Sequence, residues 1–302
     1  MARPERPVII QVRTNLGLVP GVERLGGALL DAGLAEALGA RRGPVVEAPP
    51  YSWERIHPSR LLNAEAIADV ALRQAGVVAD VLDAGAFPIM LGGDDSVIFG
   101  SLLALGRTGS HGLVFLDAHT DFYPPEHSPT GEASDSELYL AFGPGADLLP
   151  RMDGAPPLVR SRAAALIGHR DPDEQRDTGA ALRATDALVV SLARTRDLGA
   201  EETARQALAH LDGAGVERFL LHVDADVLDD ALMPAVDYRL PGGLTRREFA
   251  VLAGTLLADP RAAALDVTIY NPALDPDGSA ARDLTACLLD AFTHATTLTG
   301  RA

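Results

Sequence analysis

The stretch Val114-Phe-Leu-Asp-Ala-His-Thr-Asp-Phe-Tyr123 decides how the rest of the chain is interpreted. Three apolar residues run into Asp117, and His119 and Asp121 follow at every second position. Because alternate residues of an extended backbone point to one face, these three side chains would face the same way. Carboxylate and imidazole groups together suit a divalent cation such as Mn²⁺. A solvated turn after a buried strand is the alternative interpretation, since Asp and Thr are common turn residues.

A second, largely apolar segment ends in the same kind of residues. Phe219-Leu-Leu-His-Val-Asp-Ala-Asp226 runs as an expected strand into Asp224 and Asp226. Two such strand ends in one chain favour a metal site over two unrelated turns. A third segment, Gly92-Gly-Asp-Asp-Ser96, follows the apolar run 87–91 and brings two more carboxylates to a strand end.

Apolar segments and helical patterns alternate along the whole chain. The predicted strands cover residues 8–12, 45–46, 87–91, 112–116, 163–167, 187–191, 218–223 and 263–269. The predicted helices cover 21–38, 63–84 with Asn63 as N-cap, 97–105, 201–211, a segment that starts at Thr245 with a capping box to Glu248, and 279–296. Apolar strands separated by helices predict a three-layer α/β/α fold with a mostly parallel sheet of about eight strands. No linker or internal repeat divides the chain, so we expect a single domain over residues 1–302.

Composition excludes several classes of partner. The 302 residues are 47% hydrophobic, and the net charge of −16 gives a sequence pI near 4.8. Such an acidic surface repels nucleic acids and anionic membranes, so neither is an expected partner. The single cysteine, Cys287, lies in an apolar helix-like run, where a buried structural thiol is expected rather than a nucleophile. The sequence has no signal-peptide core and no apolar run of membrane length, which predicts a cytoplasmic protein.

The three strand ends together resemble the arginase–agmatinase–formimidoylglutamase family, the ureohydrolases. Its motifs are Gly-Gly-Asp-His-Ser, Asp-Ala-His-x-Asp and Ser-x-Asp-x-Asp-x-x-Asp-Pro, and residues 13–34, 167–173 and 233–245 are also similar to family segments. The resemblance implies an arginase-like fold and two Mn²⁺ ions bridged by a hydroxide that attacks an amidine or guanidine carbon. It also implies a small-molecule substrate and a homo-oligomer, either a trimer or a hexamer.

The resemblance also assigns roles to particular residues. It implies that Asp117 and Asp224 bridge both ions and that Asp121 and Asp95 complete one site. His119 and Asp226 would complete the other site. The candidate catalytic residues are Asp121 and Ser134. Two further positions are expected to have supporting roles: Asp229, which would hold a ligand in place rather than bind metal, and His222, where the family has Ser and where we expect a packed core histidine.

The sequence departs from the family pattern at three positions. Asp95 replaces the family's histidine, so that site is expected to be all-oxygen and open to Mg²⁺ or Ca²⁺. Ser134 aligns with the proton-shuttle histidine of arginases, within a segment 122–136 that we expect to be an exposed, substrate-side loop. Neighbouring residues that could serve instead are Glu132, Asp135 and His127. Ile269 aligns with the glutamate that receives the guanidinium group.

Two carboxylates in the family's substrate-facing loop, Asp171 and Asp173, are candidate ligands for an amino group of the substrate, with turn capping as an equally open interpretation. The leading hypothesis is a binuclear metal hydrolase of a non-peptide C–N bond in a linear amidine or an amide. The alternative is a degenerate family member that binds metal or ligand in a regulatory role without turnover. A deacetylase-like amide hydrolase is a third possibility, which rests only on a related architecture.

Overall fold

Eight parallel strands form one sheet in this computed structural model, which describes residues 7–55, 60–143 and 157–300. The sheet order is β2-β1-β3-β8-β7-β4-β5-β6. The strands are β1 (Pro7–Arg13), β2 (Arg41–Glu47), β3 (Phe87–Leu91), β4 (His111–Leu116), β5 (Ala164–Ile167), β6 (Leu188–Val190), β7 (Arg218–Asp224) and β8 (Ala262–Thr268). The predicted fold class, with about eight strands, is therefore confirmed.

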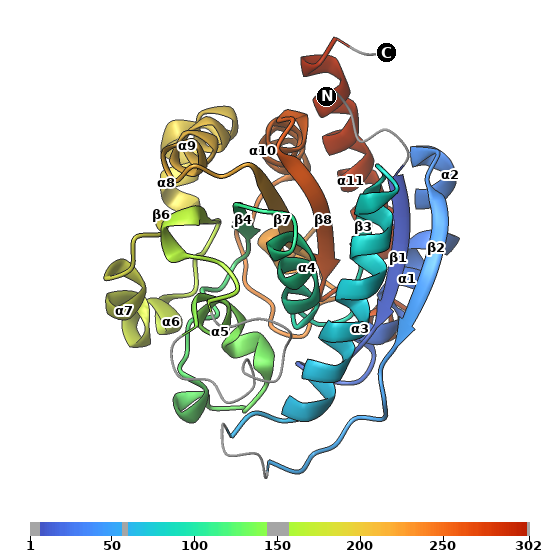
Figure 1. Cartoon of the computed structure of the whole chain (residues 1–302), viewed down its shortest axis with the longest axis vertical. Coiled ribbons are helices and arrows are strands. Elements are labelled where there is room, and N and C mark those ends of the chain that lie inside the picture. Colours follow the sequence, from blue (N-terminus) through green and yellow to red (C-terminus); the bar gives the residue numbers. More distant parts are fainter. Residues whose placement is uncertain (1–6, 56–59, 144–156, 301–302) are drawn as a thin grey trace.

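Helices cover both faces of the sheet (Figure 1). One layer is formed by α3 (Ala64–Asp83), α4 (Val97–Gly106) and α5 (Glu137–Phe142), which contact one another in that order. On the other face, α11 (Ser279–Leu298) contacts α1 (Leu25–Asp31), α2 (Leu34–Leu38) and α10 (Arg246–Ala258), and α10 also packs on α9 (Ala200–Gly213). Three short helices complete the described set, namely α6 (Pro172–Asp177), α7 (Gly179–Arg183) and α8 (Leu192–Leu198).

The central strands are buried along most of their length because helices cover both faces of the sheet. Every residue of β3 is buried, and so are nine of the ten residues of α4, which packs against β7 and β8. This continuous burial fixes the positions of the strand ends, since a slip in register would expose apolar side chains. Cys287 is fully buried in α11, as predicted for a structural thiol.

The helix boundaries show where local signals were sufficient. The capping box at Thr245 is confirmed, because its hydroxyl accepts the Glu248 N–H and the Glu248 carboxylate accepts the Thr245 N–H. Asn63 occupies the N-cap position of α3 as predicted, but its side chain makes no capping hydrogen bond. Asn63 adopts a left-handed φ of 54°, and its side chain instead joins two loops by accepting the Ser52 N–H and donating to the Leu16 carbonyl.

Two further predictions need correction. The helical pattern over 21–38 breaks into η1 (Val22–Arg24), α1 and α2, because Gly33 takes a left-handed φ of 88° between the two α-helices. The segment 122–136 is not an exposed loop. It folds inward through η2 (Pro125–His127) and η3 (Ala133–Asp135), with Phe122, Glu132 and Ser134 buried.

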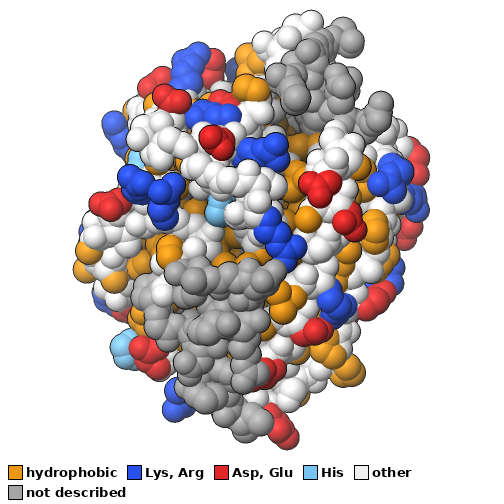
Figure 2. Space-filling view, viewed as in Figure 1, with side chains coloured by type: hydrophobic (Ala, Val, Ile, Leu, Met, Phe, Trp, Pro, Cys, Tyr) orange, Lys and Arg blue, Asp and Glu red, His pale blue; other side chains and the backbone are white. Residues whose placement is uncertain are grey.

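The surface seen over α3 and α4 carries acidic and basic side chains interspersed rather than gathered by sign (Figure 2). Among the described residues, no helix is both long enough and apolar enough to cross a bilayer.

The topology brings four strand ends together. In sheet order, β3, β8, β7 and β4 are adjacent, and they end beside Asp95, Ile269, Asp224 and Asp117. Between β3 and β4 the chain crosses two strand positions, which β8 and β7 later fill. In open α/β sheets, ligand sites form beyond the carboxyl ends of the strands at such a change in strand order. The candidate site lies at this edge.

Candidate metal centre

Asp117, His119 and Asp226 form the first group of metal-type side chains. Asp117 directly follows β4 and Asp226 follows β7, which is the neighbouring strand. His119 Nδ1 lies 2.9 Å from Asp226 Oδ2 and 3.6 Å from Asp117 Oδ1. Asp226 also accepts the Ala118 N–H at 3.2 Å, so the two strand ends are tied together.

Asp117 also belongs to a second group, with Asp121 and Glu137. Asp121 has a left-handed φ of 45°, a conformation that Asp tolerates better than most residues. The backbone N–H groups of Asp121 and Thr120 donate to the buried Glu174 carboxylate, which also accepts the Thr120 hydroxyl at 2.8 Å. Glu174 therefore fixes the loop that presents Asp121.

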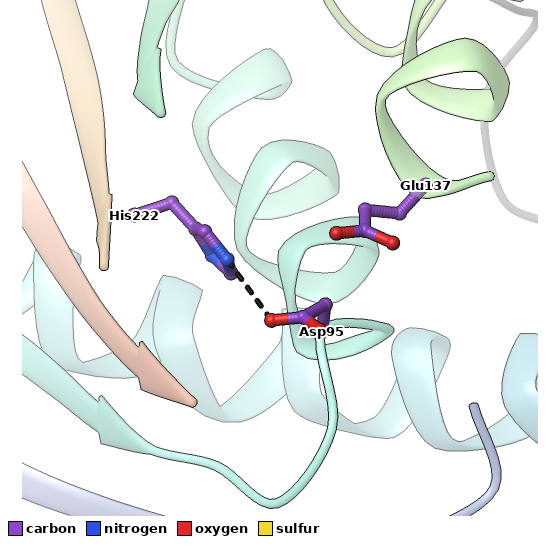
Figure 3. A group of neighbouring side chains, drawn as sticks. All are labelled: Asp95, Glu137 and His222. Carbon is purple, nitrogen blue, oxygen red and sulfur yellow. Dashed lines mark hydrogen bonds and ion pairs between the residues drawn. The ribbon is translucent and has the colours of Figure 1, made fainter. Parts of the chain in front are cut away.

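Asp95, Glu137 and His222 form the third group (Figure 3). Asp95 follows β3, Glu137 begins α5, and His222 lies on β7. His222 Nε2 is 3.3 Å from Asp95 Oδ1, and the Thr268 hydroxyl donates to the same oxygen at 2.6 Å. The second and third groups share Glu137, so the three groups form one connected cluster.

Asp224 ends β7 within this cluster. Its Oδ1 accepts the Asp226 N–H at 2.7 Å. Burial raises the pKa of Asp224 well above its ordinary value, and the nearby carboxylates of Asp226, Asp117 and Asp95 raise it further. Like charges around Asp224 are therefore close enough to oppose its ionisation.

The same repulsion affects the carboxyl groups on the α5 side. Burial raises the pKa of Glu137 well above its ordinary value, and Asp95 and Asp117 add to this. Burial also raises the pKa of Asp121, with further contributions from Asp117 and Glu137. Without cations, these groups cannot all be ionised at neutral pH.

Unpartnered atoms show that the cluster fits a metal. Both Glu137 carboxyl oxygens and Asp117 Oδ2 are buried and accept no hydrogen bond from the described residues. Burying such charges without compensation costs several kcal/mol per ion, whereas two divalent ions would neutralise them. Oxygen donors with imidazole suit Mn²⁺. The groups that fit a binuclear site are those of Asp95, Asp117, His119, Asp121, Glu137, His222, Asp224 and Asp226.

The structure corrects the expectation of an all-oxygen environment for Asp95. His222 does pack in the core as predicted, where its ring stacks on Phe115 with centroids 4.9 Å apart. However, its Nε2 also faces Asp95. The signal was present in the sequence, since His222, Asp224 and Asp226 alternate as Asp117, His119 and Asp121 do, and the same reasoning places His222 and Asp224 on one face.

Sequence reasoning missed Glu137 and Glu174 altogether. Glu137 lies sixteen positions after Asp121, and it reaches the cluster only because the segment 122–136 folds inward and the Leu138 N–H donates to the Asp121 carbonyl at 3.2 Å. Glu174 lies in α6, a helix that no local pattern predicted. Neither residue stands in a recognisable motif.

Ser134 is buried in η3, and its Oγ has no hydrogen-bond partner among the described residues. Of the neighbouring residues considered for the same role, Glu132 accepts the Tyr238 hydroxyl at 2.8 Å and Asp135 accepts the hydroxyls of Ser128 and Thr130. His127 is exposed. Ser134 therefore keeps an unused hydroxyl, while the two carboxylates already hold bonds within the loop.

Ile269 lies beside the cluster. It follows Thr268, whose hydroxyl contacts Asp95, and its N–H donates to the Gly93 carbonyl at 2.7 Å. Its side chain is buried, and its φ is 72°. A β-branched residue in this left-handed region is strained, and such strain is often found at functional sites.

The remaining predicted residues lie toward the periphery. Asp171 caps α6 by accepting the Asp173 N–H, and its Oδ2 also lies 3.9 Å from His119 Nε2. The Asp173 side chain is 73% exposed and pairs with Arg176. Asp229 accepts the Ala231 N–H in a turn. Turn capping therefore describes Asp171 and Asp229, but Asp171 also faces the metal-type group.

The arrangement can be compared with known proteins. The family model described as the arginase family matches residues 49–293. The chain belongs to the arginase family. It is 30% identical to the arginase of Bacillus caldovelox over 276 residues, which cover 88% of this chain and 91% of that one.

Solved structures extend this comparison. The native arginase of Bacillus caldovelox superimposes with a TM-score of 0.85 at 27% identity and covers 97% of this arginase-family chain and 98% of its own. The formimidoylglutamase of Bacillus subtilis strain 168 has a TM-score of 0.75 at 17% identity, covering 97% and 87%. The latter likeness shows a shared fold alone.

Proposed function

We propose that this chain is a binuclear, Mn²⁺-dependent hydrolase that cleaves a non-peptide C–N bond in a small linear amidine, guanidino compound or amide. The observation that carries the proposal is the connected cluster at four adjacent strand ends, with Asp117 shared between the His119 group and the Asp121 group. Membership of a family of hydrolases favours this function over the non-catalytic alternative.

Two bound divalent ions would supply Lewis acidity and lower the pKa of a water held beside the substrate carbon. The chain's own residues prepare this position. We propose that Asp117 and Asp224 contact both ions, that His119 and Asp226 hold one, and that Asp121 and Asp95 hold the other. Glu174 keeps Asp121 oriented through the Thr120 loop. We propose that Asp229 supports a ligand without binding metal.

The proton path differs from that of a histidine shuttle. Ser134 provides a buried hydroxyl with no partner among the described residues, and we propose that it relays or orients a proton near the cluster. A serine hydroxyl does not ionise near neutral pH, so the relay has to pass the proton on to a neighbouring water or carboxyl group. Asp121, the other candidate catalytic residue, is ionised when metal is bound and is the candidate acceptor.

The substrate class follows from Ile269. A buried guanidinium needs a carboxylate partner, since leaving it unpaired costs several kcal/mol. Ile269 offers no charge at the position where the family's glutamate is expected. We therefore propose a neutral or weakly basic C–N substrate, with Asp171 near His119 as the candidate contact for an amino group. Asp173 is the second candidate, although its side chain points to solvent.

The test is a panel of guanidino, formimidoyl and amide compounds, assayed with Mn²⁺-loaded protein for release of urea or ammonia. The expected result is Mn²⁺-stimulated hydrolysis of a neutral or weakly basic member, absent in Asp117→Ala. Turnover of arginine or agmatine at about 1–10³ per second would show that another residue supplies the missing charge. Metal binding without turnover of any compound would support the non-catalytic alternative.

The proposal includes three broader features. We propose one domain over residues 1–302, supported by a sheet that takes strands from both halves of the chain. We also propose a cytoplasmic location and a homo-oligomeric assembly, a trimer or a hexamer, and we expect no nucleic-acid or membrane partner.

A further inference from the structure

His222 is held on β7 by the two strands that flank it. Its register partners are Phe115 on β4 and Asp266 on β8. The imidazole stacks on Phe115 at an interplanar angle of 7°. Nδ1 lies 3.6 Å from Asp266 Oδ2, and Nε2 lies 3.3 Å from Asp95 Oδ1. One ring nitrogen therefore faces into the sheet and the other faces the cluster.

Asp266 is itself supported from behind. It is fully buried, and its Oδ1 accepts the Ser101 hydroxyl at 2.8 Å, while Gln74 donates to Ser101 Oγ at 3.0 Å. Asp266 Oδ2 accepts no hydrogen bond from the described residues, which leaves it to face His222 Nδ1. An imidazole whose Nδ1–H faces a carboxylate presents the Nε2 lone pair to a metal, as metal-binding histidines commonly do.

Glu137 supplies an independent observation. Its side chain is fully buried, and both carboxyl oxygens lack a hydrogen-bond partner among the described residues. It enters from α5, on the opposite side of the group from β7, and points toward Asp95 and His222 (Figure 3). Without a cation, such a buried carboxyl group stays protonated, because an isolated buried charge is too costly. A cation beside it would allow it to ionise and bind, which makes Glu137 a candidate ligand.

The spacing of the three donors suits one shared ion. Oxygen and nitrogen donors at roughly 2.1 Å from an octahedral cation lie about 3 Å apart when adjacent and about 4.2 Å apart when opposite. The Asp95 Oδ1 and His222 Nε2 atoms are 3.3 Å apart, and the donors of Asp95, Glu137 and His222 all lie within 4.8 Å of one another.

We propose that the Asp95 side of the centre takes an imidazole ligand from His222 and a further carboxylate ligand from Glu137, with Asp266 as the positioning residue for His222. The inference rests on the proposed binuclear function. In the family motif the histidine stands at the position of Asp95, and Ser stands at that of His222. This chain therefore keeps one imidazole on that side but supplies it from β7.

A consequence for metal choice follows. An imidazole ligand favours transition metals, whereas an all-oxygen site suits Mg²⁺ and Ca²⁺. The intact protein should therefore retain Mn²⁺ on the Asp95 side in the presence of excess Ca²⁺. Loss of His222 should make that ion exchangeable.

The direct test detects imidazole nitrogen at bound Mn²⁺ by electron spin-echo spectroscopy on the His119→Gln variant. This variant lacks the other histidine of the cluster, so a nitrogen coupling that persists comes from His222. The coupling should disappear in His119→Gln/His222→Gln. His111→Gln is the matched control, because His111 lies at the opposite end of β4, where its Nε2 contacts the Leu158 carbonyl at 2.6 Å. This control should keep the metal content and coupling of the intact protein.

Metal content measured by elemental analysis completes the test. His222→Gln should lose one of two equivalents after desalting against Ca²⁺, Glu137→Gln should weaken the same site, and Asp266→Asn should weaken it by roughly 10–100-fold. Circular dichroism of the metal-free variants controls for folding. The inference would be overturned if His222→Gln still held two equivalents of Mn²⁺ tightly. It would also be overturned if His119→Gln bound Mn²⁺ but showed no nitrogen coupling. Neither result would overturn the proposed function. An intact protein that binds no Mn²⁺ would instead overturn the proposed function.

Discussion

The metal-free protein should lose stability as pH rises from 6.5 to about 9. Burial lowers the pKa of His222, but Asp266 and Asp95 outweigh this effect and raise the pKa from 6.5 to about 9. A histidine whose pKa is raised on folding contributes stability that is fully present below pH 6.5 and is lost through the folded pKa. The difference of about 2.5 units corresponds to roughly 3 kcal/mol for this residue alone.

The buried carboxyl groups of the cluster also make the metal-free protein less stable as pH rises. The pKa values of Asp117, Asp121, Asp224 and Glu137 are raised chiefly by burial, so the native state holds protons that the unfolded chain has released. Their contributions are also lost as pH rises above the ordinary carboxyl range. The pKa of Asp226 is lowered because His119 outweighs the effect of burial, which affects stability only at acidic pH.

Urea denaturation in the presence of a chelator measures the effect at several pH values across this interval. The free energy of unfolding should fall by roughly 3 kcal/mol between pH 6.5 and 9. With Mn²⁺ bound, the fall should be reduced or reversed, since metal binding requires deprotonated ligands and strengthens as pH rises. A stability of the metal-free protein that stays level or increases across the interval would refute this reasoning.

Three further predictions test other parts of the account. Glu174→Ala should destabilise the protein by roughly 3 kcal/mol and weaken metal retention, because it leaves the N–H and hydroxyl donors of the Thr120 loop unpaired. Urea denaturation measures this loss, with Glu174→Gln as the milder control, and an unchanged midpoint in Glu174→Ala would contradict the prediction. Ile269→Glu should raise urea release from agmatine relative to neutral substrates, by supplying the absent carboxylate; no change in this preference would remove Ile269 as the specificity determinant. Light scattering at micromolar concentration should give the mass of a trimer or a hexamer, and a monomer would contradict the assembly.

Much of the fold followed from local pattern. Buried strands are marked by continuous apolar residues, and the capping box at Thr245 is a signal within four residues. The strand ends at Asp117 and Asp224 were equally local, because each carboxylate directly follows or ends an apolar strand. These features depend on neighbours in the sequence and could be predicted without knowledge of the tertiary structure.

The parts that failed depend on contacts between distant segments. Asn63 begins a helix, but its side chain joins loops eleven and forty-seven residues away instead of capping it. Glu137 reaches the cluster only after segment 122–136 folds inward, and Glu174 contacts residues more than fifty positions earlier. His222 is the exception, because its alternation with Asp224 and Asp226 already places the His222 side chain on the same face of the strand as Asp224. Its partnership with Asp95 required the order of β3, β8 and β7.

The central claim is that the cluster holds two divalent ions in one connected site. Elemental analysis of protein loaded with Mn²⁺ and then desalted tests this claim most directly, with Asp117→Ala as the variant that removes the carboxylate shared by two groups. The account predicts close to two equivalents in the intact protein and a loss of both in Asp117→Ala. A well-folded protein that retains no Mn²⁺ would contradict it.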